Sequence, residues 1–253
     1  MSPIAVSGVV FACVFGGVLL GMFIGRTLPV SHLGDDSKDT VKVGLALIGT
    51  LTALVLGLLV ASAKGTYDAQ NGAVKELAAN VILLDLALAR YGPETKEMRE
   101  LLGRGVTRTL HRIWPDDTTE PVNLTPGEAR AEMELFYDKV AALAPENDGQ
   151  RALKARALDI TANMAQARLR MFAQRDSSIP VPFLVVVVVW LMVLFTGYGL
   201  LAPRNLTVLT VLVICAFSVA AALFLILELD RPFAGILRVS SAPLHDALAR
   251  VGQ

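Results

Sequence analysis

Four long stretches of the chain carry no charged side chain, and more polar segments separate them. The stretches are residues 4–25, 43–63, 177–203 and 205–227. An α-helix needs about 20 apolar residues to cross a hydrocarbon core about 30 Å thick. Within lipid the backbone must satisfy its own hydrogen bonds, which favours helix in each stretch. The pattern predicts transmembrane helices at 4–25, 43–63, 181–202 and 205–228, the third beginning after Pro180.

The first stretch has a possible second meaning as a signal peptide. A signal peptide has a basic start, a short apolar region and small residues at its cleavage site. Here no basic residue precedes the apolar run, which is long and ends in Gly21 to Arg26. We therefore expect a retained transmembrane helix.

The composition agrees with a membrane protein. Hydrophobic residues make up 54% of the chain, charged residues only 18%, and the mean hydropathy is +0.55. The 23 basic residues balance the 23 acidic ones, so the charge does not favour binding to nucleic acid. We expect the lipid bilayer, and no nucleic acid, as a partner.

Four crossings would place both termini and residues 64–176 on one side of the membrane. The loop 26–42 and the turn near 203 would lie on the other side. Basic residues near helix ends favour the cytoplasm, and they number seven on the first side against four on the second: Lys64, Lys75, Arg168, Arg170, Arg175, Arg231 and Arg238 against Arg26, Lys38, Lys42 and Arg204. This predicts cytoplasmic termini and a periplasmic loop, although Arg26 after an uncharged N-terminus favours the opposite orientation for the first helix alone.

Small residues recur every four positions in the first two predicted helices. Such stripes let two helix backbones approach closely in lipid, where no hydrophobic gradient drives association. We expect the first two helices to pack on each other through these positions: Gly17, Gly21 and Gly25 in the first, and Gly49, Ala53, Gly57 and Ala61 in the second.

A different face of the second helix carries an apolar row spaced by three and four residues. The row either faces lipid or, in several copies, lines a hydrophobic constriction of a pore. The sequence alone leaves both interpretations open for Ile48, Leu51, Val55, Leu58 and Ser62.

Beyond residue 64 the pattern becomes amphipathic. A heptad of apolar positions continues from the second membrane helix to residue 91: Val74, Leu77, Val81, Leu84, Leu88 and Tyr91. Further helices are predicted at 93–113, 126–143 and 148–174. We therefore expect membrane helices over 1–63 and 177–229, a cytoplasmic helical bundle over 64–176, and an amphipathic C-terminal segment over 230–253.

The sequence offers little for catalysis or metal binding. Cys13 and Cys215 lie inside apolar stretches, and the three histidines stand far apart. The acidic loop with Asp116, Asp117 and Glu120 lacks the glycine and the ligand spacing of an EF-hand. Nucleophile and phosphate-binding motifs are missing from the sequence as well. We expect no enzyme activity, no metal and no cofactor.

Charged residues gather at the end of the fourth predicted helix. Pro232 removes a helix N–H just after Glu228, Asp230 and Arg231, so the helix should end there and the chain should turn at Gly235. We expect Asp230 and Arg231 to fix the cytoplasmic ends of neighbouring helices. The alternative places Glu228 beside an ion pathway. The crossings themselves lack titratable groups of the kind that pumps require, which disfavours an active transporter.

Several strings resemble the bacterial bestrophin-like membrane domain family over about residues 44–248. They are AKGTYDAQN at 63–71, ILLDL at 82–86, ARYGPE at 89–94, SIPVPFL at 178–184, APRN at 202–205 and LELDRPFAG at 227–235. The resemblance implies kinship to bestrophins, which are pentameric ion channels whose second membrane helices line a narrow apolar neck. Tyr67-Asp68 matches a Tyr-Asp pair of bacterial bestrophins, but the Arg-Trp-Trp that follows there is missing here.

The pattern and the resemblance together predict an all-α integral membrane protein of the bacterial inner membrane. We expect a homo-oligomer, a pentamer by resemblance, that conducts small inorganic ions passively. A non-conducting membrane-anchored scaffold or signalling protein, acting through its cytoplasmic bundle, is the alternative. The sequence does not distinguish anions from cations.

Overall fold

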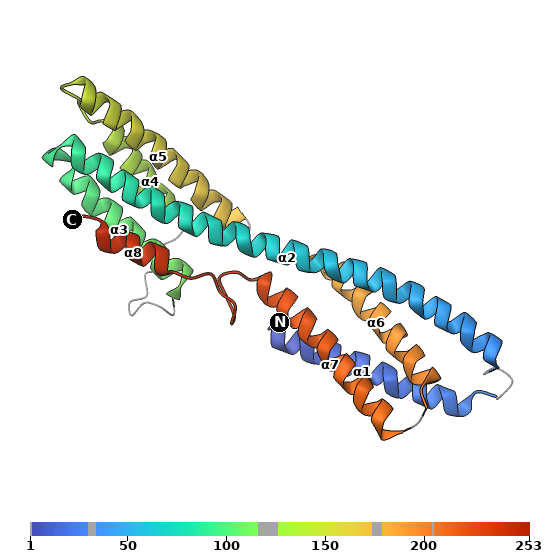
Figure 1. Cartoon of the computed structure of the whole chain (residues 1–253). Coiled ribbons are helices and arrows are strands. Elements are labelled where there is room, and N and C mark those ends of the chain that lie inside the picture. The colour runs from blue at the N-terminus through green and yellow to red at the C-terminus, as the bar shows by residue number, and fades with distance from the viewer. Residues whose placement is uncertain (1, 30–33, 116–125, 174–178, 204) are drawn as a thin grey trace. The chain divides into compact units, whose positions relative to one another are not determined.

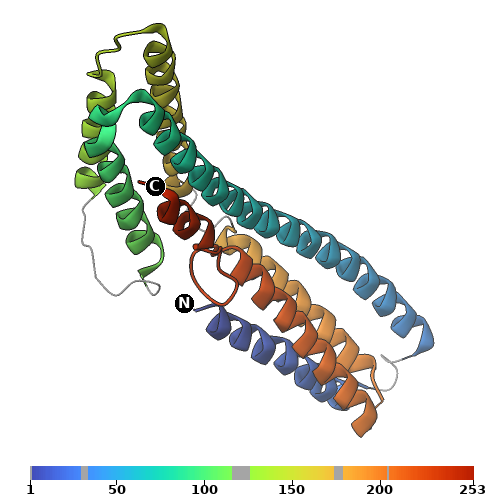
Figure 2. The same cartoon turned by 60° about the vertical axis from the view of Figure 1, so that its left-hand side comes forward.

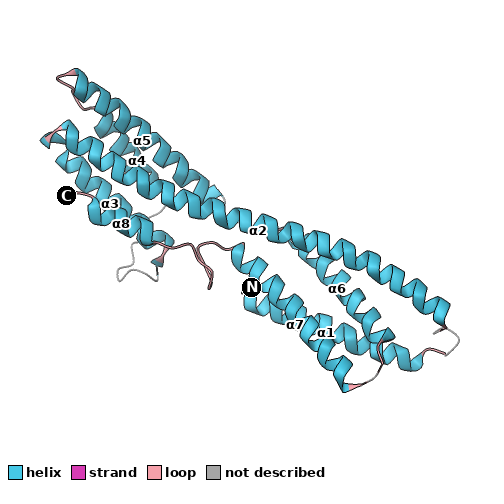
Figure 3. Cartoon of the chain, in the orientation of Figure 1, coloured by secondary structure: helices cyan, strands magenta, loops and turns pink. Residues whose placement is uncertain are grey.

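The structure, a computed structural model, describes all residues except 1, 30–33, 116–125, 174–178 and 204 (Figure 1). The described residues contain helices, turns and loops and no strand (Figure 3). The helices are α1 (Pro3–Thr27), α2 (Asp35–Tyr91), the 3-10 helix η2 (Pro93–Thr95), α3 (Lys96–Ile113), α4 (Pro126–Ala141), α5 (Asp148–Ala173), α6 (Val181–Leu201), α7 (Leu206–Leu229) and α8 (Ala242–Arg250). The predicted all-α fold class is confirmed.

Four of the described helices are long and apolar enough to span a membrane. They are α1, α2 from Asp36 onward, α6 and α7, which matches the four predicted crossings. Local chemistry explains their ends. The Ser2 hydroxyl caps α1 by accepting from the Ala5 N–H at 3.2 Å, and the Asn205 side chain caps α7 by accepting from the Val208 N–H at 2.8 Å.

The chain divides into two compact units, and α2 supplies residues to both. The first unit comprises Met1–Tyr67 and Ser177–Leu237, which contain α1, the first part of α2, α6 and α7. The second comprises Asp68–Asp176 and Arg238–Gln253, which contain the rest of α2, α3 to α5 and α8.

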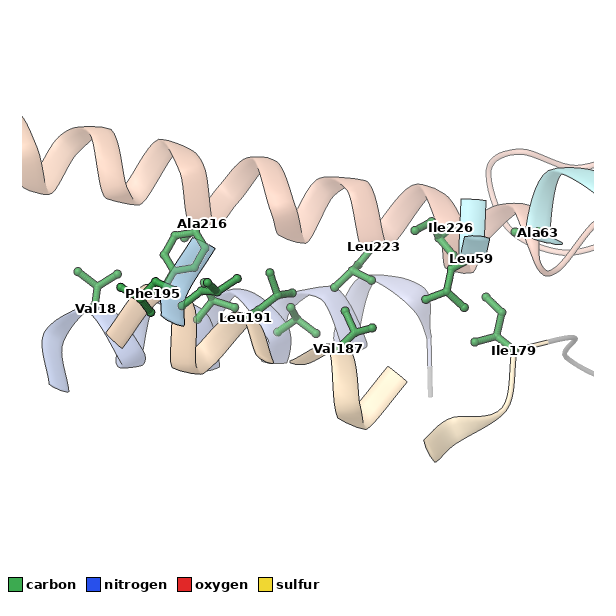
Figure 4. Close-up of a cluster of buried hydrophobic side chains, with 14 residues drawn as sticks. Val18, Leu59, Ala63, Ile179, Val187, Leu191, Phe195, Ala216, Leu223 and Ile226 are labelled. Atoms are coloured by element: carbon green, nitrogen blue, oxygen red, sulfur yellow. The ribbon is translucent and has the colours of Figure 1, made fainter. Parts of the chain in front are cut away.

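The first unit is built on α1, α6 and α7, which lie side by side in both views (Figures 1 and 2). Its buried apolar cluster takes side chains from these three helices, from α2 and from Ile179 (Figure 4). The cluster comprises Val10, Val14, Val18, Leu45, Leu59, Ala63, Ile179, Val187, Leu191, Leu194, Phe195, Ala216, Leu223 and Ile226. Close side-chain packing of this kind holds membrane helices together, since lipid is as apolar as leucine.

Helix α1 packs on α6 and α7. The glycines of its stripe contact α6, and their predicted packing on the small residues of α2 stays a prediction. A Cβ built on Gly17 would lie 2.9 Å from the Met192 carbonyl oxygen, and one on Gly21 would collide with the Thr196 carbonyl oxygen. A stripe of small residues permits close approach without specifying the partner. On α6 the contact is made at Gly199, where a Cβ would collide with the Val18 carbonyl oxygen.

Helix α2 continues without interruption to Tyr91, as the amphipathic pattern predicts. It begins at Asp35, ahead of its apolar stretch. In the second unit all six heptad positions are buried, from fully buried Val74 to Tyr91 at 4% exposure. Helices α3, α4, α5 and α8 complete this unit alongside α2 (Figure 2).

The remaining helices also match their predicted positions. The predicted helix 93–113 is the short η2 followed by α3, while α4 and α5 end at Ala141 and Ala173. Thr125, the expected cap of α4, lies outside the described residues. Helix α7 ends at Leu229, and the chain turns at Gly235 with a φ of 90°, as predicted. The amphipathic C-terminal segment contains α8.

Candidate ion-pathway surface

The part of α2 within the first unit has a buried and an exposed face. On the buried face, Leu45, Leu59 and Ala63 belong to the apolar cluster, and Ala63 is fully buried. Thr52 is also buried, and its hydroxyl donates to the Ile48 carbonyl oxygen at 2.7 Å. This side of α2 therefore faces the rest of its own unit.

The exposed face of α2 is a row of leucines that the described part of the chain leaves uncovered. Leu47 is 63% exposed, Leu51 41%, Leu54 66% and Leu58 64%. Residues 43–63 contain no charged side chain, so this surface is entirely uncharged over the length of a bilayer crossing. We call these four residues the α2 leucine face.

The predicted apolar row divides between the two faces. Ile48 and Val55 are half-buried and pack against the apolar cluster, whereas Leu51, Leu58 and Ser62 are exposed. Residues spaced by three and four positions cover a wide part of a helix surface. Ile48 and Val55 lie at the edge of this surface that contacts the core of the unit. Sequence reasoning missed Leu47 and Leu54, which lie toward the centre of the exposed face.

The small residues of α2 are mostly exposed as well. A Cβ on Gly49 would make ordinary contact with Leu194 at 3.8 Å, but one on Gly57 would meet nothing within 4 Å. Ala53, Gly57 and Ala61 are exposed. In α1, Gly17 and Gly21 are buried and Gly25 is half-buried. The α1 part of the predicted packing stripe thus acts inside the chain, whereas the α2 part is open.

Glu228 lies at the end of α7 and is only 2% exposed. One of its carboxylate oxygens accepts hydrogen bonds from the backbone N–H groups of Ile236 at 2.7 Å and Leu237 at 3.4 Å. Gly235 lies so close that a Cβ there would collide with the same carboxylate. The carboxylate therefore closes the turn after α7, and we call this arrangement the Glu228 clamp.

Asp230 and Arg231 occupy the same turn. Asp230 is the C-cap residue of α7 and is 5% exposed, while Arg231 is exposed and its backbone N–H donates to the Glu228 carbonyl oxygen at 3.1 Å. Their predicted role in fixing neighbouring helices stays a prediction. The sequence did not predict the Glu228 clamp, because an acidic residue near the end of a helix does not indicate which backbone N–H groups its carboxylate will bind.

We expect Glu228→Leu to destabilise the protein and Glu228→Gln to be milder. Leucine removes the carboxylate that accepts from the N–H groups of Ile236 and Leu237, and a hydrogen bond to a charged group contributes about 1.5–3 kcal/mol. Glutamine keeps one acceptor oxygen. Thermal unfolding in detergent measures the difference, and equal losses in both variants would contradict the clamp.

Metal chemistry finds no support in the described part of the chain, where no three His, Cys, Asp or Glu side chains gather as ligands. The acidic loop considered for calcium, with Asp116, Asp117 and Glu120, lies outside the described residues. Cys13 on α1 is half-buried, Cys215 on α7 is exposed, and both are free thiols.

The helices and their apolar surfaces define an all-α integral membrane protein with four candidate spans and a separate helical unit. Residues 12–244 match the model of the Bestrophin-like family, which is described as a Bestrophin-like domain. The match covers most of the chain, so the chain belongs to this family. No curated protein matches the sequence.

Solved structures with the same fold are similar over nearly the whole chain. One is a bacterial bestrophin homologue from Klebsiella pneumoniae with a leucine-to-threonine substitution, at 14% identity and a TM-score of 0.67, covering 95% of this chain and 99% of that one. A glycine-to-alanine variant of a membrane protein has 13% identity and a TM-score of 0.69, with 95% and 96% covered. At these identities the similarity establishes the fold alone.

Proposed function

We propose that the protein is a homo-oligomeric channel that conducts small ions passively, with the α2 leucine face lining part of the pathway. The observation that carries the proposal is this uncharged, uncovered face on a helix whose opposite side is buried in its own unit. Known members of the family and fold are ion channels. Several copies of an apolar face can form a hydrophobic constriction, which gates by excluding water.

The open α2 stripe supports the oligomer. Ala53, Gly57 and Ala61 offer a groove in which another helix can approach closely. Among the described residues of one chain, none lies within 4 Å of a Cβ built on Gly57. A neighbouring protomer is the occupant we infer, and a pentamer is the number that the bestrophin kinship favours.

Ion flux tests the pathway. In liposomes loaded with an ion-sensitive dye, Leu58→Ser should raise flux several-fold above wild type, because a hydroxyl eases wetting of an apolar constriction. Leu225→Ser is the matched control: it makes the same change at an exposed leucine of α7, where Leu225 is 50% exposed. Equal effects in both variants, or no flux in any protein, would contradict the pathway.

The alternative function gives a different result. A membrane-anchored scaffold should form no ion path even when correctly folded. A monodisperse monomer without flux would therefore favour the scaffold. A conducting oligomer whose flux Leu58→Ser leaves unchanged would keep the channel but remove the α2 leucine face from its pathway.

Orientation in the bacterial inner membrane is part of the proposal, with both termini in the cytoplasm. In a background of Cys13→Ala and Cys215→Ala, a cysteine at Ser37 should react with an impermeant maleimide added to whole cells. A cysteine at Ser240 should react only after lysis. Both serines are exposed, so accessibility within the fold does not bias the comparison, and the reverse labelling pattern would invert the topology.

A further inference from the structure

The second unit contains an apolar cavity of about 120 Å³ that the ion pathway does not use. Its walls come from several helices of the unit. Leu77, Val81 and Leu84 of α2 line it, as do Phe136 of α4 and Met164 of α5. All five side chains are buried, and those of Val81 and Leu84 are fully buried.

Four arginines also line this cavity. Arg104, Arg108 and Arg112 recur every four residues along α3, so they share one face of that helix, and Arg168 comes from α5. Among the described residues that line the cavity there is no Asp or Glu. The lining therefore combines apolar side chains with four guanidinium groups.

The two threonine side chains of the lining are already satisfied. The Thr109 hydroxyl donates to the Gly105 carbonyl oxygen at 2.8 Å, and the Thr161 hydroxyl donates to the Ala157 carbonyl oxygen at 2.7 Å. Both bonds lie within a single helix. Arg168 is the group of the lining through which a ligand would be recognised.

Arg168 is the most distinctive of the four. It is half-buried, and burial together with the neighbouring Arg112 lowers the pKa of its guanidinium. A cationic side chain in such surroundings is stabilised by an anion that reaches it with good hydrogen-bond geometry.

We propose that this cavity binds a small monocarboxylic acid with an unbranched or ring-shaped apolar body. The carboxylate faces Arg168, and the apolar body lies against Leu77, Val81 and Met164. An apolar cavity of about 150 Å³ holds a benzene molecule, so this one suits a body of about six carbons. Ligand sites of this kind are mostly apolar with a few placed polar groups.

Hexanoate is the probe, added to the full-length protein in lipid nanodiscs and measured by calorimetry at pH 7.5. Three related compounds separate the contribution of the charge from that of the apolar body. Acetate has the negative charge without the apolar body, hexanol has the apolar body without the charge, and hexylammonium carries the opposite charge. Hexanoate should bind at least about tenfold more tightly than each of them. Equal binding of hexanoate and hexanol would overturn the role of Arg168. A measurement with empty nanodiscs is subtracted to correct for partition into lipid.

Gly105 gives a way to fill the cavity. It lines the cavity, and a Cβ built on it meets nothing within 4 Å. Gly105→Leu should therefore occupy the ligand's space and abolish hexanoate binding, while Gly105→Ala should weaken it and raise helix stability. Gly103→Ala is the matched control, because it gives α3 the same gain in helix propensity and meets Val251 at an ordinary 3.6 Å.

Arg168→Gln tests the charge without filling the space. It should weaken hexanoate binding about tenfold or more and leave the weak binding of hexanol unchanged. Retained binding in both Gly105→Leu and Arg168→Gln would overturn the proposal, as would no binding to the wild type. The readout is binding rather than flux, so the result is independent of whether the protein conducts.

Discussion

Gly21→Leu should abolish the folded state of the membrane unit. Even a Cβ at this position would collide with the Thr196 carbonyl oxygen and lie 2.8 Å from the Leu200 backbone nitrogen. Both obstacles are backbone atoms of α6, so no side-chain rotation relieves the overlap. Overpacking a tight core costs about 1–3 kcal/mol and sometimes more, and here two helices must separate. We expect the variant to aggregate on extraction in mild detergent.

Gly16→Leu is the control for this experiment. Gly16 is the neighbour of Gly17 on the same helix, and a Cβ there meets nothing within 4 Å. The substitution adds the same volume and the same hydrophobicity to α1. Size-exclusion profiles and thermal unfolding should match wild type. A stable Gly21→Leu variant would contradict the α1–α6 contact, and a Gly16→Leu variant that aggregates would show a surface covered by another chain.

The helices themselves could be predicted because the physics that specifies them is local. A long charge-free run can satisfy its backbone in lipid only as helix, and Pro182 or Asn205 marks where such a helix begins. The heptad from Val74 to Tyr91 likewise predicted a buried stripe, and all of its positions are buried. Length, charge and periodicity are enough for these features.

The partners of the helices could not be predicted in the same way. Gly17 and Gly21 show that α1 meets a backbone closely, but not which one. The partner of α1 is the segment Thr196-Gly197-Tyr198-Gly199 of α6. Its two glycines are two residues apart, so they form no stripe on one face of the helix and gave no signal in the sequence. In the structure Gly197 abuts Leu45 of α2 and Gly199 abuts Val18 of α1, so α6 contacts two helices from two sides.

The same limit applies to the candidate pathway. In lipid an outward face and an interface are both apolar, so hydrophobicity does not tell a buried row from an exposed one. Heptad spacing selected Ile48 and Val55 together with Leu51 and Leu58, yet only the last two are exposed. The structure shows which side of α2 the chain itself covers, and that side decides which positions remain for another chain or for ions.

Trp114→Ala should be the most destabilising single truncation in the second unit. Trp114 ends α3, is 1% exposed, and its indole N–H donates to the Val239 carbonyl oxygen at 2.8 Å. The bond joins α3 to the segment that leads into α8. Truncating a buried Trp costs about 3–5 kcal/mol, and the Val239 carbonyl would lose its donor. Chemical denaturation of the purified protein measures the loss.

Trp114→Phe separates the hydrogen bond from the packing. It keeps most of the buried ring but cannot donate to Val239, so it should cost only about 0.5–1.5 kcal/mol for the bond, with a further penalty if the carbonyl stays dry. Limited trypsin digestion gives a second readout, because Arg238 precedes α8, Arg250 is the last residue of α8, and both are exposed. Cleavage at Arg238 should accelerate strongly in Trp114→Ala and only slightly in Trp114→Phe. Equal protection in wild type and Trp114→Ala would mean that α8 is held by its other contacts, such as the 3.4 Å bond from the Gly252 N–H to Asp85.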